Sequence, residues 1–250
     1  MESYYKLGGT MLRELNILDA QSIAFTGAGG KTTAVYTCVE EFLKEGIPAL
    51  AVTTTKMRKP NRDFIPWNEE TDLDKIVHMI LKERKSPKPR LWTLGVDLQN
   101  GKISEAPEEV FGYMRKQGIR LCVEADGSAG KWIKVPREYE PAVPSWIDVQ
   151  IGILNGRAIG RTFLEAAHRP EECAAWFLKD PDEKITAEDL AKLYLHPEGI
   201  LKGQTKRKRA VLSGMRPGEG ITFMRKFPKM KEKMRKSGLP FYIWEYAYAE

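Results

Sequence analysis

The stretch Phe25–Thr33, "FTGAGGKTT", decides the fold prediction, because it places three glycines, a lysine and two threonines between an apolar run and a helical pattern. The preceding residues 21–25, "QSIAF", have the pattern of a short buried strand, whereas Val35, Val39 and Phe42 recur at helical spacing after it. A glycine-rich turn between a strand and a helix lets backbone amides approach an anion closely. The stretch therefore predicts a phosphate-binding loop.

Each residue type in this loop has an expected role. Lys31 is expected to reach the terminal phosphates of a nucleotide and Thr32 to offer its hydroxyl to Mg²⁺. The full pattern G-x-x-x-x-G-K-[ST] would need glycine where Phe25 stands, and the shorter form resembles the "GTxGKTT" loop of the Mur ligases, which are ATP-dependent carboxylate-amine ligases. The alternative is a glycine-rich turn with an incidental lysine. The residues predicted to bind nucleotide are Gly27, Ala28, Gly29, Gly30, Lys31, Thr32 and Thr33.

A second motif, "RLCVEADGSAG" at residues 120–130, places two carboxylates at the end of a predicted buried strand. Glu124 and Asp126 are two residues apart, so they are expected to share one face of the strand, roughly 7 Å from one another. Ligands of parallel sheets bind beyond the carboxyl ends of the strands. We therefore predict Lys31, Glu124 and Asp126 as catalytic residues, with Asp126 on Mg²⁺, Glu124 on the attacking group and Ser128 as a substrate contact. The alternative is two acids that end a strand in solvent.

Two further pairs are weaker candidates for substrate contacts. Thr55 and Lys56 follow the predicted strand 48–53, where they could contact a phosphate or simply end the strand. His168 and Arg169 precede Pro170, where they could act in acid-base chemistry or bind an anion, or simply begin a helix.

Strand and helix patterns alternate along the chain, which predicts βαβ units and an α/β fold. We expect a mainly parallel sheet with helices on both faces, like that of P-loop NTPases, in a single domain over residues 1–250 with a less regular excursion at about 131–205. The predicted strands are 22–26, 48–53, 90–94, 118–125, 147–154, 208–213 and 239–246. The predicted helices are 32–45, 70–83, 108–116 and 220–236.

Composition narrows the class of protein. Apolar residues make up 42% and charged residues 30% of the 250 positions, which is typical of globular proteins. No apolar run approaches the roughly 18 residues of a membrane span, and the first residues lack the pattern of a secretory signal, so we expect a cytoplasmic protein without a membrane partner. The 3 cysteines are dispersed, which predicts reduced thiols. The net charge of +6 favours anionic ligands, although "KGQTKRKR" at 202–209 is interpreted as a solvated loop and not as a nucleic-acid contact.

Four motifs in order resemble the YqeC family, whose members are described as selenium-dependent molybdenum hydroxylase accessory proteins. They are "GAGGKTT" at 27–33, "TTTK" at 53–56, "VEADGSAG" at 123–130 and "HRPE" at 168–171. The resemblance implies a nucleotide-binding protein that helps mature molybdenum hydroxylases carrying a selenium cofactor, with such a hydroxylase or its cofactor as partner. Many relatives have an "LNQAD"-like stretch where this chain has "VLSGM" at 211–215, and we therefore expect ATP, with another nucleoside triphosphate as the alternative.

These patterns leave the activity open between three hypotheses. The first is a Mg²⁺-dependent protein that hydrolyses ATP or another nucleoside triphosphate, or transfers its phosphoryl group. The second is a chaperone or delivery module that nucleotide switches without turnover. The third is an ATP-dependent ligase similar to the Mur enzymes, for which the chain lacks the length of their extra domains.

Overall fold

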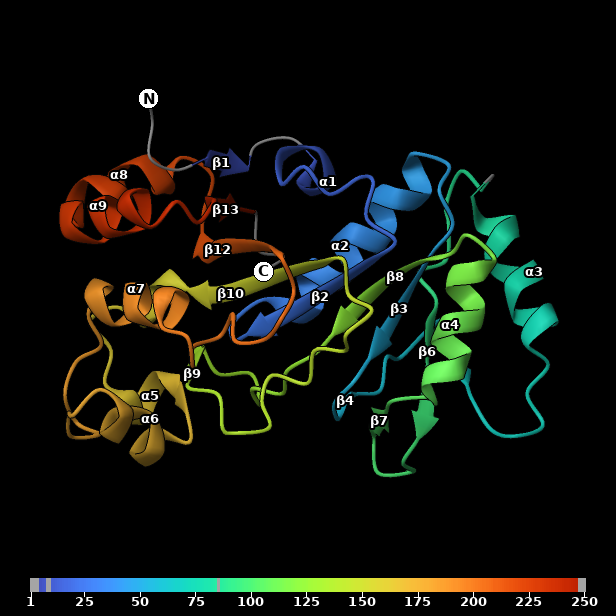
Figure 1. Ribbon diagram of the computed structural model, residues 1–250, viewed down its shortest axis with the longest axis horizontal. Coiled ribbons are helices and arrows are strands. Elements are labelled where there is room, and N and C mark those ends of the chain that lie inside the picture. Colours follow the sequence, from blue (N-terminus) through green and yellow to red (C-terminus); the bar gives the residue numbers. More distant parts are fainter. Residues whose placement is uncertain (1–4, 8–9, 85, 247–250) are drawn as a thin grey trace.

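The computed structural model describes residues 5–7, 10–84 and 86–246, and its central feature is a mostly parallel β-sheet (Figure 1). Among the described residues the strand order is β1-β13-β12-β10-β2-β8-β3-β6-β7-β4, with β5 paired to β6. Only the β6–β7 and β7–β4 pairs within this sheet are antiparallel. Its strands are β1 (Tyr5–Leu7), β2 (Ser22–Gly27), β3 (Ala49–Thr53), β4 (Met57–Arg58), β5 (Phe64–Pro66), β6 (Thr93–Asp97), β7 (Lys102–Ser104), β8 (Arg120–Glu124), β10 (Val149–Asn155), β12 (Arg207–Met215) and β13 (Phe241–Glu245).

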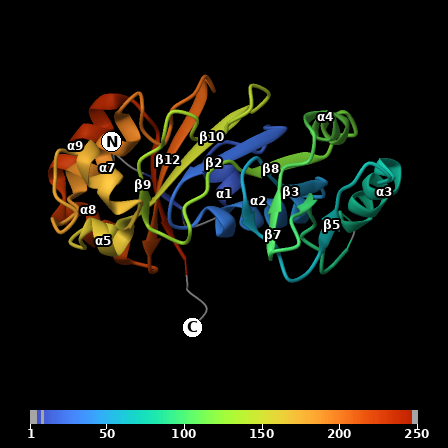
Figure 2. The same cartoon turned by 90° about the horizontal axis from the view of Figure 1, so that it is seen from below.

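Helices cover both faces of this sheet, as the alternating pattern predicted. Figure 2 shows α3 and α4 towards one end of the sheet, with α5, α7, α8 and α9 grouped at the other. The helices are α1 (Met11–Glu14), α2 (Lys31–Lys44), α3 (Leu73–Glu83), α4 (Glu108–Lys116), η1 (Gly156–Ala158), α5 (Phe163–Ala166), α6 (Pro170–Trp176), α7 (Ala187–Leu195), α8 (Glu219–Lys226) and α9 (Pro228–Ser237). A separate two-stranded sheet joins β9 (Ile133–Lys134) to β11 (Ala167–His168).

The alternation of side chains along each strand produces the layers. On β2, Ile23 and Phe25 pack with the buried face of α2, whereas Ala24 points into the core beneath α3 and α4. On β12 the same alternation sends Val211 towards the α2 layer and Leu212 towards α7 and α9. Period-2 alternation with both faces apolar is what a sheet buried between helix layers requires. The fold class predicted from the sequence is confirmed.

The chain fills the sheet first on one side of β2 and then on the other. After β2 it builds β3 and β8, with β8 inserted between β2 and β3, and it then crosses to place β10 and β12 on the opposite side. This reversal makes β2 the topological switch point of the sheet. Ligands of doubly wound α/β folds bind there, outside the carboxyl ends of the strands.

Two element predictions are wrong at particular places. The predicted helix 220–236 is split into α8 and α9, because Pro228 cannot donate a backbone hydrogen bond and instead begins a new helix after Phe227. The predicted strand 90–94 begins at Thr93 and continues to Asp97, because Val96 and Asp97 gain antiparallel partners on β7. Three glycines just past helix ends, Gly46, Gly118 and Gly238, adopt left-handed conformations.

Candidate functional site

The predicted phosphate loop joins β2 to α2 at the switch point of the sheet (Figure 1). Gly27, Gly29 and Gly30 have φ angles of 87°, 80° and 129°, which side chains disfavour. There is also no room for side chains: a Cβ on Gly27 would lie 2.3 Å from the Ile153 carbonyl oxygen, and one on Gly29 would lie 2.5 Å from the Asn155 Cβ. The glycines are therefore needed to fit the loop against β10.

The amides of the loop divide into two groups. The Gly27 amide donates to Asp126 Oδ2 at 3.1 Å, and the Ala28 amide donates to the Ile153 carbonyl at 2.8 Å. The amides from Gly29 to Thr33 have no acceptor among the described residues, as expected for the opening turn of a helix. Their N–H groups and the helix dipole together form a binding surface for an anion.

The side chain of Lys31 lies inside the loop and is only 3% exposed. Its Nζ donates to the Gly27 carbonyl at 2.8 Å and to Ser128 Oγ at 2.9 Å. Burial lowers the pKa of Lys31, and the nearby carboxylates of Glu124 and Asp126 oppose that shift. An ammonium group has three donors, so the lysine retains one hydrogen for an anion bound in the loop.

Glu124 faces this helix start from the neighbouring strand β8, whose last residue it is. Its Oε2 accepts a hydrogen bond from Thr32 Oγ1 at 2.6 Å, across 92 residues of sequence. Glu124 is 7% exposed, so its carboxylate lies at the floor of the cavity and not free in solvent. The structure therefore brings the predicted carboxylate, threonine and lysine to one side of the sheet.

The sequence of this chain is similar to those of known proteins. A model of the YqeC protein family matches residues 23–171. The chain belongs to the YqeC protein family. The Escherichia coli (strain K12) protein named "Uncharacterized protein YqeC" is 29% identical over 190 residues, which cover 76% of this chain and 73% of that protein. No solved structure matches.

The YqeC match extends over the loop, the acidic strand end and all the other predicted site residues, the last of which is Arg169. Several of them line one cavity of about 810 Å³ at the carboxyl edge of the sheet. From the predicted set, these are Gly29, Gly30, Lys31, Thr32, Thr33, Thr55, Lys56, Glu124, Ser128 and His168. Gly27, Ala28, Asp126 and Arg169 are not among its lining residues.

Asp126 differs from its sequence prediction. Its Oδ1 forms an ion pair with Lys134 and its Oδ2 accepts from the Gly27 amide, so both oxygens are already engaged. Burial raises the pKa of Asp126, and the charges of Lys134 and Lys31 counter that shift. Thr32 is paired with Glu124 instead. The position expected for Asp126, beside the threonine hydroxyl, is therefore held by Glu124.

Lys134 is the residue that the sequence analysis missed. Its side chain is 0% exposed, and its Nζ also donates to the Gly127 carbonyl at 2.8 Å and lies 2.9 Å from Glu140 Oε1. Burial alone would raise the pKa of Glu140, but hydrogen bonds from the Arg137 amide, Lys134 and Arg169 lower it to about 2. A lysine in "KWIKVP" gives no local signal of this role, because its partners come from other segments.

His168 and Arg169 have separate roles in the YqeC-family chain. Arg169 donates to Glu140 Oε2 at 2.6 Å and to the Val135 carbonyl at 3.2 Å, so it completes the Lys134 network. His168 lies on β11 opposite Lys134 of β9 and lines the cavity. Burial and the charges of Arg169 and Lys134 lower its pKa and so favour the neutral imidazole.

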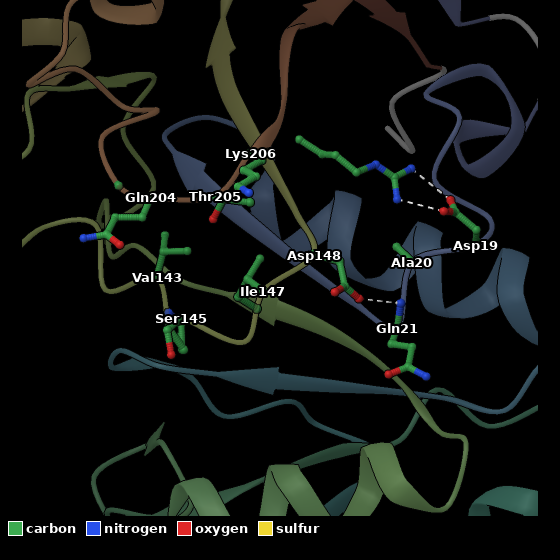
Figure 3. A pocket seen from close by; sticks show the side chains of 13 residues that line it. Asp19, Ala20, Gln21, Val143, Ser145, Ile147, Asp148, Gln204, Thr205 and Lys206 are labelled. Atoms are coloured by element: carbon green, nitrogen blue, oxygen red, sulfur yellow. Dashed lines mark hydrogen bonds and ion pairs between the residues drawn. The ribbon is translucent and has the colours of Figure 1, made fainter.

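A larger cavity, of about 1020 Å³, lies at the opposite edge of the sheet, where β2, β10 and β12 begin (Figure 3). Its acids are satisfied: Asp148 Oδ2 accepts from the Gln21 amide at 2.8 Å, and Asp19 forms an ion pair with Arg207 at 2.8 Å. Asp19, Gln21 and Arg207 also lie outside the stretch that matches the family. The cavity at the carboxyl edge is therefore the candidate functional site.

Two kinds of feature are absent from residues 5–7, 10–84 and 86–246. No group of three or more histidine, cysteine or acidic residues could hold a metal ion by itself. No described helix is both long and apolar enough to cross a membrane. All three cysteines are buried free thiols, and burial raises the pKa of Cys173 to about 12.

Proposed function

We propose that this YqeC-family protein binds a Mg²⁺-nucleoside triphosphate, ATP in the first instance, and hydrolyses it or transfers its phosphoryl group during maturation of selenium-dependent molybdenum hydroxylases. The observation that carries the proposal is the Thr32–Glu124 hydrogen bond of 2.6 Å beside a loop whose amides from Gly29 to Thr33 have no acceptor among the described residues. Family membership supports the accessory role.

The donor set fits the proposed ion and its nucleotide. Thr32 and Glu124 supply hard oxygen atoms, and Mg²⁺ takes few protein ligands because it keeps waters and phosphate oxygens in its shell. When bound, Mg²⁺ would neutralise phosphate charge. The amides from Gly29 to Thr33 would bind the phosphates, and Lys31 would donate a hydrogen bond to a phosphate oxygen through its remaining N–H group. This assignment gives Glu124 the metal role that the sequence analysis gave to Asp126.

Catalysis would rest on positioning and charge neutralisation. In hydrolysis the oxygen of water bonds to the terminal phosphorus as the bond from phosphorus to the nucleoside diphosphate oxygen breaks. The proton of that water needs an acceptor in the cavity; because Glu124 is assigned to Mg²⁺, His168 is the group given this role. Asp126 would act as a positioning residue, because it holds the Gly27 amide and so the shape of the loop.

The test is the substitution Lys31→Met, which keeps the length of the side chain and removes its charge. ATP affinity, measured by calorimetry with Mg²⁺, should fall about 10- to 100-fold, because a charged hydrogen bond contributes about 1.5–3 kcal/mol. The matched control is Lys44→Met on the same helix, where the lysine pairs with Glu40 on the surface at 2.7 Å. Equal ATP affinity in both variants would refute the proposal.

One observation supports the non-hydrolytic alternative as a second candidate. Lys134 pairs with Asp126, which binds the loop, and with Glu140, which in turn pairs with Arg169. Occupancy of the loop could therefore alter the positions of Glu140 and Arg169 without turnover, as a nucleotide-switched delivery module requires. Phosphate release by the purified protein separates the candidates: steady release that Lys31→Met abolishes supports hydrolysis, and nucleotide binding without release supports the switch.

A further inference from the structure

The wall of the cavity that faces away from β2 carries three cationic side chains on one small antiparallel ladder. Lys56 directly precedes β4, Arg58 ends β4, and Lys102 begins β7. All three are exposed and line the same cavity as the phosphate loop. We call Lys56, Arg58 and Lys102 the basic wall.

The ladder places two of these charges side by side. Arg58 and Lys102 are direct partners in the antiparallel register, and Lys56, two residues before Arg58, lines the same cavity. Like charges directly opposite one another destabilise a pair of strands. An anion between them would remove this repulsion, and Arg58 can bind a phosphate or carboxylate with two parallel hydrogen bonds.

Nothing within the described part of the chain neutralises the basic wall. None of its three side chains forms an ion pair there, whereas the adjacent Lys59 pairs with Asp97 at 2.5 Å. Of the other charged residues that line the cavity, Lys31 and Lys131 are cationic and Glu124 and Glu140 are acidic. Positive charge is therefore in excess and would concentrate small anions in the cavity.

The basic wall lies apart from the amides that would bind the nucleotide. Lys56 follows β3, which is separated from β2 by β8, so two strand spacings of about 4.8 Å place it roughly 10 Å along the sheet from the loop. Glu124, the last residue of β8, lies between them. A ligand on the wall would thus face the proposed Mg²⁺ position from the side opposite the loop.

We propose that the basic wall binds a second, anionic small-molecule substrate that carries a phosphate or carboxylate group, next to the bound nucleotide. This inference rests on the proposed function for the presence of the nucleotide, and it adds the class of the second substrate. Glu124 and His168 would then lie in a cavity with a binding surface for one reactant at each side.

The experiment measures binding of radiolabelled inorganic phosphate by equilibrium dialysis, with Mg²⁺ and a saturating non-hydrolysable ATP analogue. The wild-type protein should bind phosphate beyond the nucleotide, and Arg58→Gln/Lys102→Gln should bind it at least about tenfold more weakly, as expected for the loss of two charged contacts. The control Lys75→Gln/Lys82→Gln makes the same charge change on exposed lysines of α3 and should match the wild type. Competition by succinate would show that the wall accepts a carboxylate, and its absence that it requires a phosphate.

Measurements of thermal stability and of nucleotide affinity show whether a loss of phosphate binding is specific to the basic wall. The wall variant should melt no lower than the wild type, because it removes a repulsion, and its affinity for the ATP analogue should change less than threefold. Equal phosphate binding in the wall variant would overturn the proposal, as would a loss of nucleotide affinity as large as the loss of phosphate binding. A third measurement titrates phosphate into Lys31→Met in the absence of nucleotide. If this variant binds phosphate and the further substitutions Arg58→Gln/Lys102→Gln remove that binding, the basic wall is supported even if the wild type binds no nucleotide. In that case only the proposed function fails.

Discussion

The two edges of the sheet hold cavities of similar size, about 810 Å³ at the carboxyl edge and about 1020 Å³ at the amino edge, but their polar groups are arranged differently. At the amino edge the carboxylates already have partners, as the Asp148–Gln21 bond shows (Figure 3). At the carboxyl edge the amides from Gly29 to Thr33 and the basic wall have none among the described residues. Unsatisfied donors, and not cavity volume, distinguish the candidate binding site.

The carboxyl edge differs from the amino edge in one further respect. Behind its unpaired donors lies a supporting layer of buried charged side chains that are paired with one another. Lys134 and Asp126 form that layer, with 0% and 1% of their side chains exposed. The comparison therefore predicts large effects in the supporting layer, intermediate effects in the loop and small effects at the amino edge.

The largest expected effect is that of Lys134→Met. The substitution leaves Asp126 buried without its cation, and breaking a buried pair in this way costs about 3–5 kcal/mol. Urea unfolding should show this loss in the free energy of unfolding. The control is Lys131→Met, whose partly exposed ammonium donates to the Glu165 carbonyl at 3.0 Å and should cost under about 1 kcal/mol. Equal losses would mean that the supporting layer is no different from the surface.

An intermediate effect is expected for Gly29→Ala, compared with Gly46→Ala. Both glycines have left-handed φ angles, 80° and 74°, but only Gly29 lacks space, since a Cβ on Gly46 would meet nothing within 4 Å. Gly46→Ala should lower the free energy of unfolding by about 1 kcal/mol from backbone conformation alone. Gly29→Ala should lower it by about 2–4 kcal/mol, because overpacking adds about 1–3 kcal/mol.

Nucleotide affinity provides the second measurement on the same pair of variants. Gly29→Ala shifts the loop and should weaken binding of Mg²⁺-ATP, whereas Gly46→Ala changes only the far end of α2 and should leave it unchanged. If both variants bound ATP equally, the exact backbone of the loop would not matter and the comparison between the two edges would fail.

The smallest effect is expected at the amino edge, for Asp19→Asn. The Asp19 side chain is 70% exposed, and exposed ion pairs contribute less than about 1 kcal/mol. Thermal unfolding should shift little and ATP affinity not at all. A clear loss of ATP affinity in this variant would assign function to the amino-edge cavity and reverse the comparison.

Sequence reasoning predicted the strand, loop and helix around Lys31 and the parallel sheet with its longer strands, because these depend on local periodicity and on glycine. It also predicted that Glu124 would approach the loop, since carboxyl ends of parallel strands share one edge. It did not predict the break at Pro228 inside a basic helical pattern, nor the pairing of β6 with β7, which extends a strand beyond its apolar run.

By itself, the sequence determined the conformations that near neighbours impose: the left-handed glycines of the loop, the alternation along the strands and the amphipathic helices. Only the tertiary structure decided which polar and charged side chains become partners. Glu124 accepts a hydrogen bond from Thr32 across 92 residues of sequence, Lys134 forms an ion pair with Asp126, and Arg58 lies opposite Lys102. The physical reason is that backbone preferences act over a few residues, whereas the partner of a charged side chain depends on which strands become neighbours and on how deeply each group is buried.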